Sequence, residues 1–410
     1  MGWGAPHFDE SVRTGAAFWS LRSGLVAAYP PLTTDERCDV AVIGAGVTGA
    51  LTAQTLCAAG HDVVVLDQHD VALGSTAACT GLLQYETDTD LGELVEKTGT
   101  ARAVASWKAG RHAIDAIARL CRDRLPPCGF ARRPSLYLAT TRSEESHLRD
   151  ELALRARLGF DVGWVDSRAL RDRQIRARGG IRSDGDAEID PYRFTHALLD
   201  DVCWIGGRVY DRTEVTRIRA SARGVSLSTT RGPEVRARRL IVATGYDGDR
   251  EIAPRKGQLH STWAVVSEPV ADLDWWTERA LMWEARRPYT YLRTTDDGRI
   301  MVGGEDEPWA RQHQSERTLT RKARDLSRRF AERIPGIDLD VAYAWAGTFA
   351  TSRDGLPFIG PRADRPHTWF ALGYGGNGIT FSMIAAERAR QWLAGVPLDD
   401  LFAFERASAH

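Results

Sequence analysis

The sequence predicts a fold of the α/β class, α+β overall, with one dinucleotide-binding domain and a second domain on a mixed, largely antiparallel sheet. Three observations lead to this prediction. An apolar stretch near residue 40 runs directly into a glycine-rich turn and a helix-length segment. A second glycine cluster occupies residues 373–378, near the end of the chain. Between the two clusters, residues 263–270, 289–293 and 299–303 alternate as antiparallel strands do.

The first glycine-rich turn has the spacing of a dinucleotide site. The apolar run 40–43 is followed by Gly44, Gly46 and Gly49 in GxGxxG spacing, then by a predicted helix at 50–59 and a predicted strand at 63–66. Gly44 permits the sharp turn, Gly46 lets the backbone approach a pyrophosphate, and Gly49 lets the helix pack on the sheet. The phosphates would bind at the helix N-terminus, where N–H groups and the dipole favour an anion.

Asp67 ends the second strand of this unit, 23 residues after Gly44. That separation is close to the about 20 residues expected for the acid that binds a ribose diol. A carboxylate there would repel a 2′-phosphate, so a ligand without that group is favoured. The alternative interpretation is a glycine-rich turn in an ordinary α/β domain.

Length and composition limit the classes of protein. With 410 residues the chain is long for one core, so two domains are expected. Lys and Arg number 54 against 55 Asp and Glu, which does not indicate a nucleic-acid partner. The six cysteines have no metal-type spacing, and no apolar run approaches about 20 residues. We therefore expect no metal site, no membrane span and a reduced, cytoplasmic setting.

The rest of the chain is predicted to alternate between helices and strands. Helices are expected at 91–122, 143–158, 191–202, 315–334 and up to residue 393, and strands at 135–140, 207–210, 215–219, 225–229 and 239–245. Because the last of these strands is again apolar and ends in Thr244-Gly245, the chain is predicted to leave the dinucleotide domain and return to it. Six arginines at 168–182 form either a solvated face or a phosphate patch.

The second glycine cluster, 373–378, lies between an apolar strand at 369–372 and a long helix. A helix N-terminus there offers N–H donors to a partial negative charge, such as the N1–C2=O edge of a reduced flavin. The alternative is a turn that only packs on the sheet. Two clusters so far apart in the chain fit the two ends of one FAD better than two separate ligands.

In this order, the motifs resemble those of the FAD-dependent D-amino-acid oxidase (DAO) superfamily, which includes glycine and sarcosine oxidases, and within it the γ-glutamylputrescine oxidoreductase-type branch. The resemblance spans about residues 18–393. The features that carry it are the GxGxxG turn with Asp67, the Gly74-Ser75-Thr76 loop, Asp190-Pro191, Ala243-Thr244-Gly245, Lys256-Gly257-Gln258, Gly303-Gly304, Asp354-Gly355-Leu356-Pro357 and Gly375-Gly376-Asn377-Gly378.

The resemblance implies a Rossmann-like FAD-binding domain interleaved with a substrate domain, with the flavin ring between them. The implied divisions are an N-terminal arm at 1–34, an FAD-binding domain at 35–90, 183–253 and 335–410, and a substrate domain at 91–182 and 254–334. The cofactor contacts that it implies are Gly44, Gly46, Val47, Thr48, Gly49, Asp67, Gln68, Gly74, Ser75, Thr76, Cys79, Thr80, Leu82, Val215, Thr244, Gly245, Gly347, Gly375, Gly376, Asn377, Gly378, Ile379 and Thr380.

The implied reaction oxidises the C–N bond of a small amine or amino acid. Hydride passes from the carbon that bears a neutral amine to flavin N5, the imine hydrolyses in water, and O2 or another acceptor reoxidises the flavin. This reaction depends more on placing the substrate against the flavin than on an acid–base pair. The lack of an obvious His/Asp/Ser constellation therefore does not argue against it.

Two departures from the family bear on how FAD is held. Sarcosine oxidases attach flavin through a cysteine where this chain has Gly347, and relatives that use a histidine have it near the position of Ala78. We therefore expect non-covalent FAD. Cys79 lies in the corresponding loop, but a lone cysteine is more often a small packed residue.

A third departure concerns the substrate. In glycine oxidases an arginine clamps the substrate carboxylate at the position that Phe349 occupies here, which favours an amine, an N-substituted amine or a larger substrate. Arg353, Arg293 and Arg299 are candidate replacement cations, although each also fits a structural role.

Three further side chains are candidates for the catalytic centre. Lys256 could stabilise superoxide during reoxidation, or it is a solvated lysine; His260 and Tyr291 are candidate pocket residues. Two other functions stay open from the sequence: an NAD-dependent dehydrogenase, which the lack of a second full GxGxxG unit disfavours, and a non-catalytic dinucleotide-binding protein.

Overall fold

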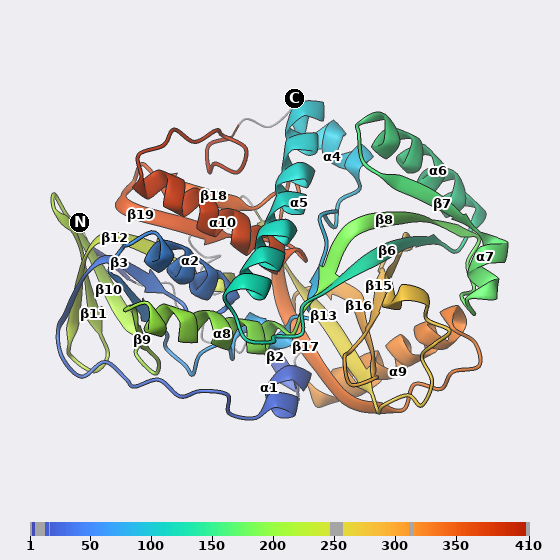
Figure 1. Ribbon diagram of the computed structural model, residues 1–410, viewed down its shortest axis with the longest axis horizontal. Coiled ribbons are helices and arrows are strands. Elements are labelled where there is room, and N and C mark those ends of the chain that lie inside the picture. Colours follow the sequence, from blue (N-terminus) through green and yellow to red (C-terminus); the bar gives the residue numbers. More distant parts are fainter. Residues whose placement is uncertain are drawn as a thin grey trace.

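The computed structural model describes residues 2–4, 13–15, 17–246, 257–310, 313 and 315–406, and these form two large sheets with helices between and around them (Figure 1). The nine-stranded sheet has the order β1-β10-β11-β12-β3-β4-β9, with β19 also paired to β12 and β18 to β19. Its strands are β1 (Gly2–Gly4), β3 (Glu36–Ile43), β4 (Val63–Leu66), β9 (Arg208–Tyr210), β10 (Val215–Ser221), β11 (Gly224–Thr229), β12 (Glu234–Val242), β18 (Phe358–Arg362) and β19 (Arg365–Leu372).

The centre of this sheet is parallel and buried on both faces. β3 pairs in parallel with β4 and with β12, and β12 pairs in parallel with β19. Val40 and Val42 belong to the core beneath the helices, whereas Ala41 and Ile43 belong to the core on the opposite face. Burial on both faces explains why the run 40–43 is apolar throughout instead of alternating.

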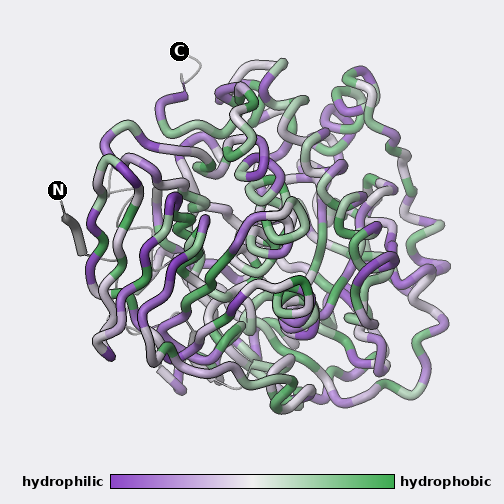
Figure 2. Tube along the Cα trace, turned by 60° about the vertical axis from the view of Figure 1, so that its left-hand side comes forward, coloured by the Kyte–Doolittle hydropathy of each residue, from purple (hydrophilic) through white to green (hydrophobic). Residues whose placement is uncertain are grey.

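Three helices cover this sheet, with α2 (Val47–Ala58) packed against both α8 (Pro191–Trp204) and α10 (Gly378–Leu393). The predicted return of the chain to this domain is confirmed, because β12 is the direct neighbour of β3 despite nearly 200 intervening residues. Figure 2 shows hydrophilic and hydrophobic residues interchanging along the outer strands, as in β10, where Val215 and Ile218 are buried between exposed positions.

The ten-stranded sheet has the order β2-β17-β13-β16-β15-β14-β6-β8-β5, with β7 paired to β8. The predicted antiparallel strands pair as expected, β13 with β16 and β16 with β15, while the β14–β6 pair is parallel. The strands are β2 (Arg13–Gly15), β5 (Leu82–Leu83), β6 (Ala131–Ala139), β7 (Val162–Asp166), β8 (Gly179–Glu188), β13 (Gly257–Ser267), β14 (Leu281–Glu284), β15 (Thr290–Thr294), β16 (Ile300–Pro308) and β17 (Val341–Ser352).

The remaining helices are α1 (Phe18–Ser23), α3 (Ser75–Ala78), α4 (Leu91–Thr98), α5 (Thr100–Asp123), α6 (Arg142–Arg157), α7 (Ser167–Asp172) and α9 (Glu316–Arg333), with a 3₁₀ turn at Thr277–Arg279. The single helix predicted at 91–122 is wrong, since Gly99 adopts a φ of +84° and divides it into α4 and α5. None of the helices within the described ranges is long and apolar enough to cross a lipid bilayer.

Candidate active site

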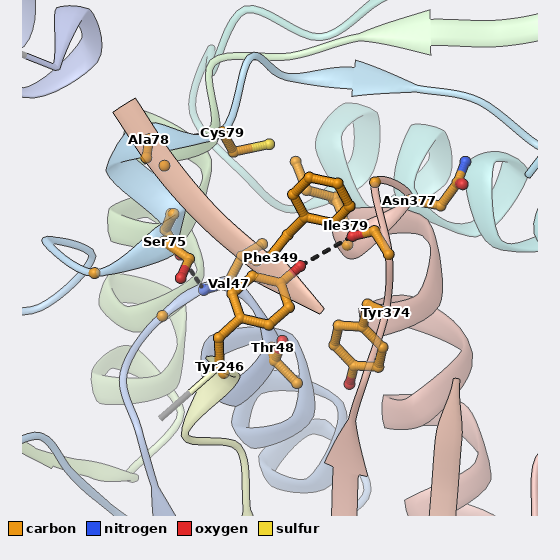
Figure 3. A pocket seen from close by; sticks show the side chains of 18 of the residues that line it. Val47, Thr48, Ser75, Ala78, Cys79, Tyr246, Phe349, Tyr374, Asn377 and Ile379 are labelled. Carbon is orange, nitrogen blue, oxygen red and sulfur yellow. Dashed lines mark hydrogen bonds between the residues drawn. The ribbon is translucent and has the colours of Figure 1, made fainter. Parts of the chain in front are cut away.

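One cavity is lined by residues of both glycine clusters and by residues of the ten-stranded sheet. At one end it is lined by Gly44 and Gly46, which follow β3; further along it is lined by Gly375 and Gly376, which precede α10. Figure 3 shows Val47 and Ser75 on one side of this space and Tyr374 and Asn377 on the other, with the Phe349 ring between them. The geometry therefore brings together the two turns that the sequence placed on one ligand.

Two glycines of the GxGxxG turn are required by packing of the protein itself. Gly44 has a φ of +103°, and a Cβ on it would lie 2.3 Å from the carbonyl oxygen of Ala243. A Cβ on Gly49 would lie 1.7 Å from the carbonyl oxygen of Gly44. Gly49 does not line the cavity; it fixes the turn that does. The Val47 N–H at the start of α2 donates to the Thr76 hydroxyl at 3.0 Å, which ties the turn to the Gly74-Ser75-Thr76 loop (Figure 3).

Asp67 lines the cavity beyond the end of β4. Its carboxylate accepts the N–H groups of Ala45 at 2.7 Å and His69 at 2.9 Å, so the turn and the acid hold each other in place. Burial raises the pKa of Asp67, while these two N–H groups lower it. Nearby, Thr244 has a buried hydroxyl oxygen without a hydrogen-bond partner among the described residues, and it also lines the cavity. A ribose and pyrophosphate would supply the partner that this hydroxyl lacks.

The second glycine cluster begins α10, whose first turn has no side-chain cap. The Tyr246 hydroxyl donates to the carbonyl oxygen of Gly375 at 2.9 Å (Figure 3), and the Asn377 amide donates to the carbonyl of Glu86 at 2.8 Å. The Gly376 N–H, which the sequence placed on the flavin edge, donates instead to the Asp88 carboxylate at 2.6 Å.

The predicted cofactor residues line this cavity with two exceptions, Gly49 and Thr380. Thr380 lies on α10 with its hydroxyl 3.2 Å from the carbonyl oxygen of Gln84, to which it donates. The members that line the cavity are Gly44, Gly46, Val47, Thr48, Asp67, Gln68, Gly74, Ser75, Thr76, Cys79, Thr80, Leu82, Val215, Thr244, Gly245, Gly347, Gly375, Gly376, Asn377, Gly378 and Ile379.

The positions used for covalent attachment in relatives carry no nucleophile here. Gly347 and Ala78 face each other across the cavity wall, since a Cβ on Gly347 would lie 3.4 Å from that of Ala78. The neighbouring Cys79 accepts the Gly81 N–H at its sulfur, and burial raises the pKa of its thiol. A thiol with a raised pKa is a poor nucleophile, so none of these three positions offers a covalent link to a flavin.

Three arginines were candidate substrate cations, and none of them lines the cavity. Arg293 is buried and donates to the carbonyl oxygens of Gly81 and Ile189 at 2.8 and 3.0 Å, which is a structural role. Arg299 forms ion pairs on the surface with acidic neighbours, and Arg353 is exposed. Arg287 is the one Arg or Lys that lines the described cavity; Lys256 lies outside the described residues.

Of the other catalytic candidates, Phe349 and Tyr291 line the cavity. His260 stands behind Phe349, with the two rings stacked 5.2 Å apart and its Nε2 3.0 Å from the Thr351 hydroxyl. Burial lowers the pKa of His260. His260 thus supports the aromatic wall from behind.

The Gly303-Gly304 pair positions two tyrosines, Tyr291 on the neighbouring β15 and Tyr289 directly before that strand. A Cβ on Gly303 would lie 2.3 Å from the Tyr291 ring, and a Cβ on Gly304, whose φ is +124°, would lie 2.2 Å from the carbonyl oxygen of Tyr289. Only glycine allows both approaches. This sequence motif therefore serves the cavity wall, which contains Tyr289 and Tyr291.

The sequence analysis missed Asp88, Tyr246, Thr262, Arg287 and Tyr289, all of which line the cavity. Tyr246 directly follows the Ala243-Thr244-Gly245 strand end and could have been found from that motif. The others lie in loops or on strands whose facing direction depends on pairing across the sheet, and they carry no local signal.

The parallel-sheet dinucleotide fold, with a cavity joining both glycine clusters to an aromatic chamber, defines the class of dinucleotide-dependent oxidoreductases. Residues 39–392 match the family DAO, described as FAD dependent oxidoreductase, and the chain belongs to this family. Its cofactor is therefore FAD, and the residues around Thr244 and Asp67 fit that molecule.

Several known proteins are similar to this chain. The γ-glutamylputrescine oxidoreductase of Escherichia coli is 28% identical over 396 residues, covering 93% of this chain and 89% of the relative. A glycine oxidase of Geobacillus kaustophilus is 25% identical over 366 residues, covering 85% of this chain and 90% of the relative. The crystal structure of glycine oxidase from Geobacillus kaustophilus superposes with a TM-score of 0.75, covering 91% of this chain and 99% of the other at 23% identity.

Proposed function

We propose that this protein oxidises the C–N bond of a small amine or amino acid by hydride transfer to FAD, releasing an imine that hydrolyses in water. The observation that carries the proposal is the single cavity that runs from the GxGxxG turn past the α10 N-terminus into a chamber walled by Tyr246, Tyr289, Tyr291 and Phe349. The relatives named for glycine and γ-glutamylputrescine support the choice of a C–N substrate.

When bound, FAD would accept the electrons, and the side chains of the protein would position the substrate and the cofactor. The Val47 end of α2 and Asp67 would hold the phosphates and ribose, and the α10 N-terminus would offer its dipole to the pyrimidine edge. Phe349 and the tyrosines exclude water around the reacting carbon and fix its distance from the ring. We further propose that the nine-stranded sheet carries the FAD-binding domain and the ten-stranded sheet the substrate domain. The bounds then differ from those expected from the sequence, because β5, β17 and part of β8 belong to the ten-stranded sheet although they fall in segments expected for the FAD-binding domain.

The substrate of this enzyme is proposed to be an amine rather than a simple α-amino acid held by an arginine clamp. Phe349 lines the chamber at the clamp position, and none of Arg293, Arg299 and Arg353 reaches it. The electron acceptor is proposed to be O2 or another small acceptor. A cytoplasmic setting fits the six cysteines, which are all free thiols, including Cys121 and Cys128 with sulfurs 3.6 Å apart.

The test begins with the purified protein. It should be yellow, absorb near ~450 nm and release FAD on denaturation. Glycine, sarcosine, dimethylglycine, putrescine and γ-glutamylputrescine are then supplied, with peroxide release and dye reduction followed in parallel. Bleaching of the flavin by an amine supports the proposal, and the two readouts identify the acceptor. A colourless protein, or a flavin that NADH reduces and every amine leaves oxidised, refutes it.

A further inference from the structure

Two neighbouring carboxylates, of which one lines the cavity, lack cationic partners among the described residues. Asp88 lines the cavity in the loop between β5 and α4, and Asp306 lies on β16. Among the described residues, no Lys or Arg side chain lies within ion-pair distance of either carboxylate. Arg287 approaches Asp88 but donates to its main-chain carbonyl at 3.0 Å.

The acidic residues on either side of Asp306 in β16 both form ion pairs, whereas Asp306 forms none with the described residues. Glu305 pairs with Arg329 at 2.6 Å and Glu307 with Lys322 at 2.7 Å, both on the side covered by α9. Asp306 points to the other side of β16. Its Oδ1 atom is buried and has no hydrogen-bond partner in the described part of the chain. A buried carboxylate oxygen without a donor costs free energy unless a ligand supplies one.

Tyr289 connects the two acids. Its hydroxyl lies 3.4 Å from Asp88 Oδ1, and it also interacts with the Asp306 carboxylate, whose pKa it lowers together with the Thr262 hydroxyl. Burial, first, and repulsion by Asp88 raise the pKa of Asp306, to about 7. Burial likewise raises the pKa of Asp88, against the Gly376 N–H, which lowers it.

We propose that Asp88 binds the ammonium group of the substrate, and that the chain Asp88–Tyr289–Asp306 takes up the proton that the amine loses before it is oxidised. This inference rests on the proposed function and specifies its substrate as a protonated amine. In the step, an N–H bond of the ammonium breaks and an O–H bond forms on Asp88, which turns a cation and an anion into a neutral amine and a neutral acid. Tyr289 then exchanges that proton with Asp306.

The surroundings fit this assignment. The rings of Tyr289 and Tyr291, 6.0 Å apart, offer faces to a cation beside the acids. The other charged or titratable groups that face the pair are Arg287, which lies over the Tyr289 ring at 5.0 Å, and His260, whose pKa burial lowers and which is therefore neutral near pH 7. Asp306 lies behind Tyr289, and its negative charge together with that of Asp88 outweighs the single guanidinium of Arg287, which favours a cationic ligand at Asp88.

The test uses the FAD-loaded enzyme and tert-butylamine, which has no hydrogen on the carbon next to nitrogen and therefore cannot be dehydrogenated. The neutral isostere tert-butanol is the control ligand, and the flavin visible spectrum reports binding. The variants are Asp88→Asn and Asp306→Asn. Asp90→Asn is the matched control, because Asp90 lines the same cavity two residues from Asp88 but accepts the Tyr137 hydroxyl at 2.9 Å.

The wild-type enzyme should bind tert-butylamine saturably and tert-butanol not at all. Asp88→Asn should raise the Kd by about tenfold or more, since a charge-assisted bond is lost, while Asp90→Asn should change it by less than about threefold. Asp306 is ionised above its pKa, and an alkylamine stays protonated up to a pH of about 10. The wild-type Kd should therefore fall as the pH rises through 7, and this dependence should vanish in Asp306→Asn.

The inference is overturned if the wild-type spectrum does not respond, if Asp88→Asn binds as tightly as wild type, if Asp90→Asn weakens binding equally, or if Asp306→Asn keeps the pH dependence. FAD content and melting temperature identify a variant that fails to fold. Should Asp88→Asn fail in that way, Tyr289→Phe takes its place and should also abolish the dependence near pH 7. If the enzyme oxidises amines although one of these results overturns the inference, the proposed function is still supported.

Discussion

Gly49→Ala tests the interpretation of the GxGxxG turn most directly. The added Cβ would lie 1.7 Å from the carbonyl oxygen of Gly44, where a contact below 3.0 Å does not occur, so the two must separate by about 1.3 Å. Both atoms are fixed by backbone, Gly44 through its N–H bond of 2.8 Å to Leu66 and Gly49 within α2. The turn must therefore open at the point where the pyrophosphate binds.

Overpacking against backbone costs about 3 kcal/mol, the upper part of the usual range. If that cost falls on the FAD-bound conformation, the Kd for FAD rises by about 150-fold. The assay is titration of the apoprotein with FAD, followed by quenching of flavin fluorescence. Gly163→Ala, on β7 with nothing within 4 Å of the added Cβ, is the control and should bind FAD as wild type does. A folded Gly49→Ala protein with a Kd within about threefold of wild type would refute the reasoning.

Three further substitutions have defined outcomes. In Gly376→Ala the Cβ would lie 2.6 Å from Asp88 Oδ1 and expel that carboxylate, so we expect a loss of about 1.5–3 kcal/mol in unfolding free energy and a shifted flavin midpoint potential; an unchanged potential would contradict the placement of this turn. Arg293→Gln removes a buried guanidinium that binds four carbonyl groups, and thermal unfolding should show a loss of about 3–5 kcal/mol. Arg406 holds Asp354 through bonds of 2.6 and 2.8 Å and lowers its pKa, a contribution that is present above the ordinary pKa of 3.8 and lost as the pH falls through the lower, folded value. Arg406→Ala should therefore destabilise the protein at pH 7 and weaken the dependence of its melting temperature on acid below about pH 4.

The sequence by itself determined the parts of this protein that depend on local spacing. Gly44, Gly46 and Gly49 with Asp67 predicted a dinucleotide site, because a tight strand-to-helix turn is encoded within a few consecutive residues. The helix–strand order and the return of the chain at 239–245 were predictable for the same reason, since an apolar run of this kind is buried on both faces wherever it lies.

Only the tertiary structure decided which side chains meet in the substrate chamber. Asp88 lies in a loop, Tyr289 directly precedes β15 and Asp306 lies on β16. The register of these strands is set by pairing across the sheet, and a shift of one residue would turn Asp306 to the opposite face. The same dependence removed Arg293 from the list of candidates, because its carbonyl partners come from segments distant in sequence. Spacing along a chain encodes turns and helices. Which side chains face one another in a cavity is decided only when the strands pair.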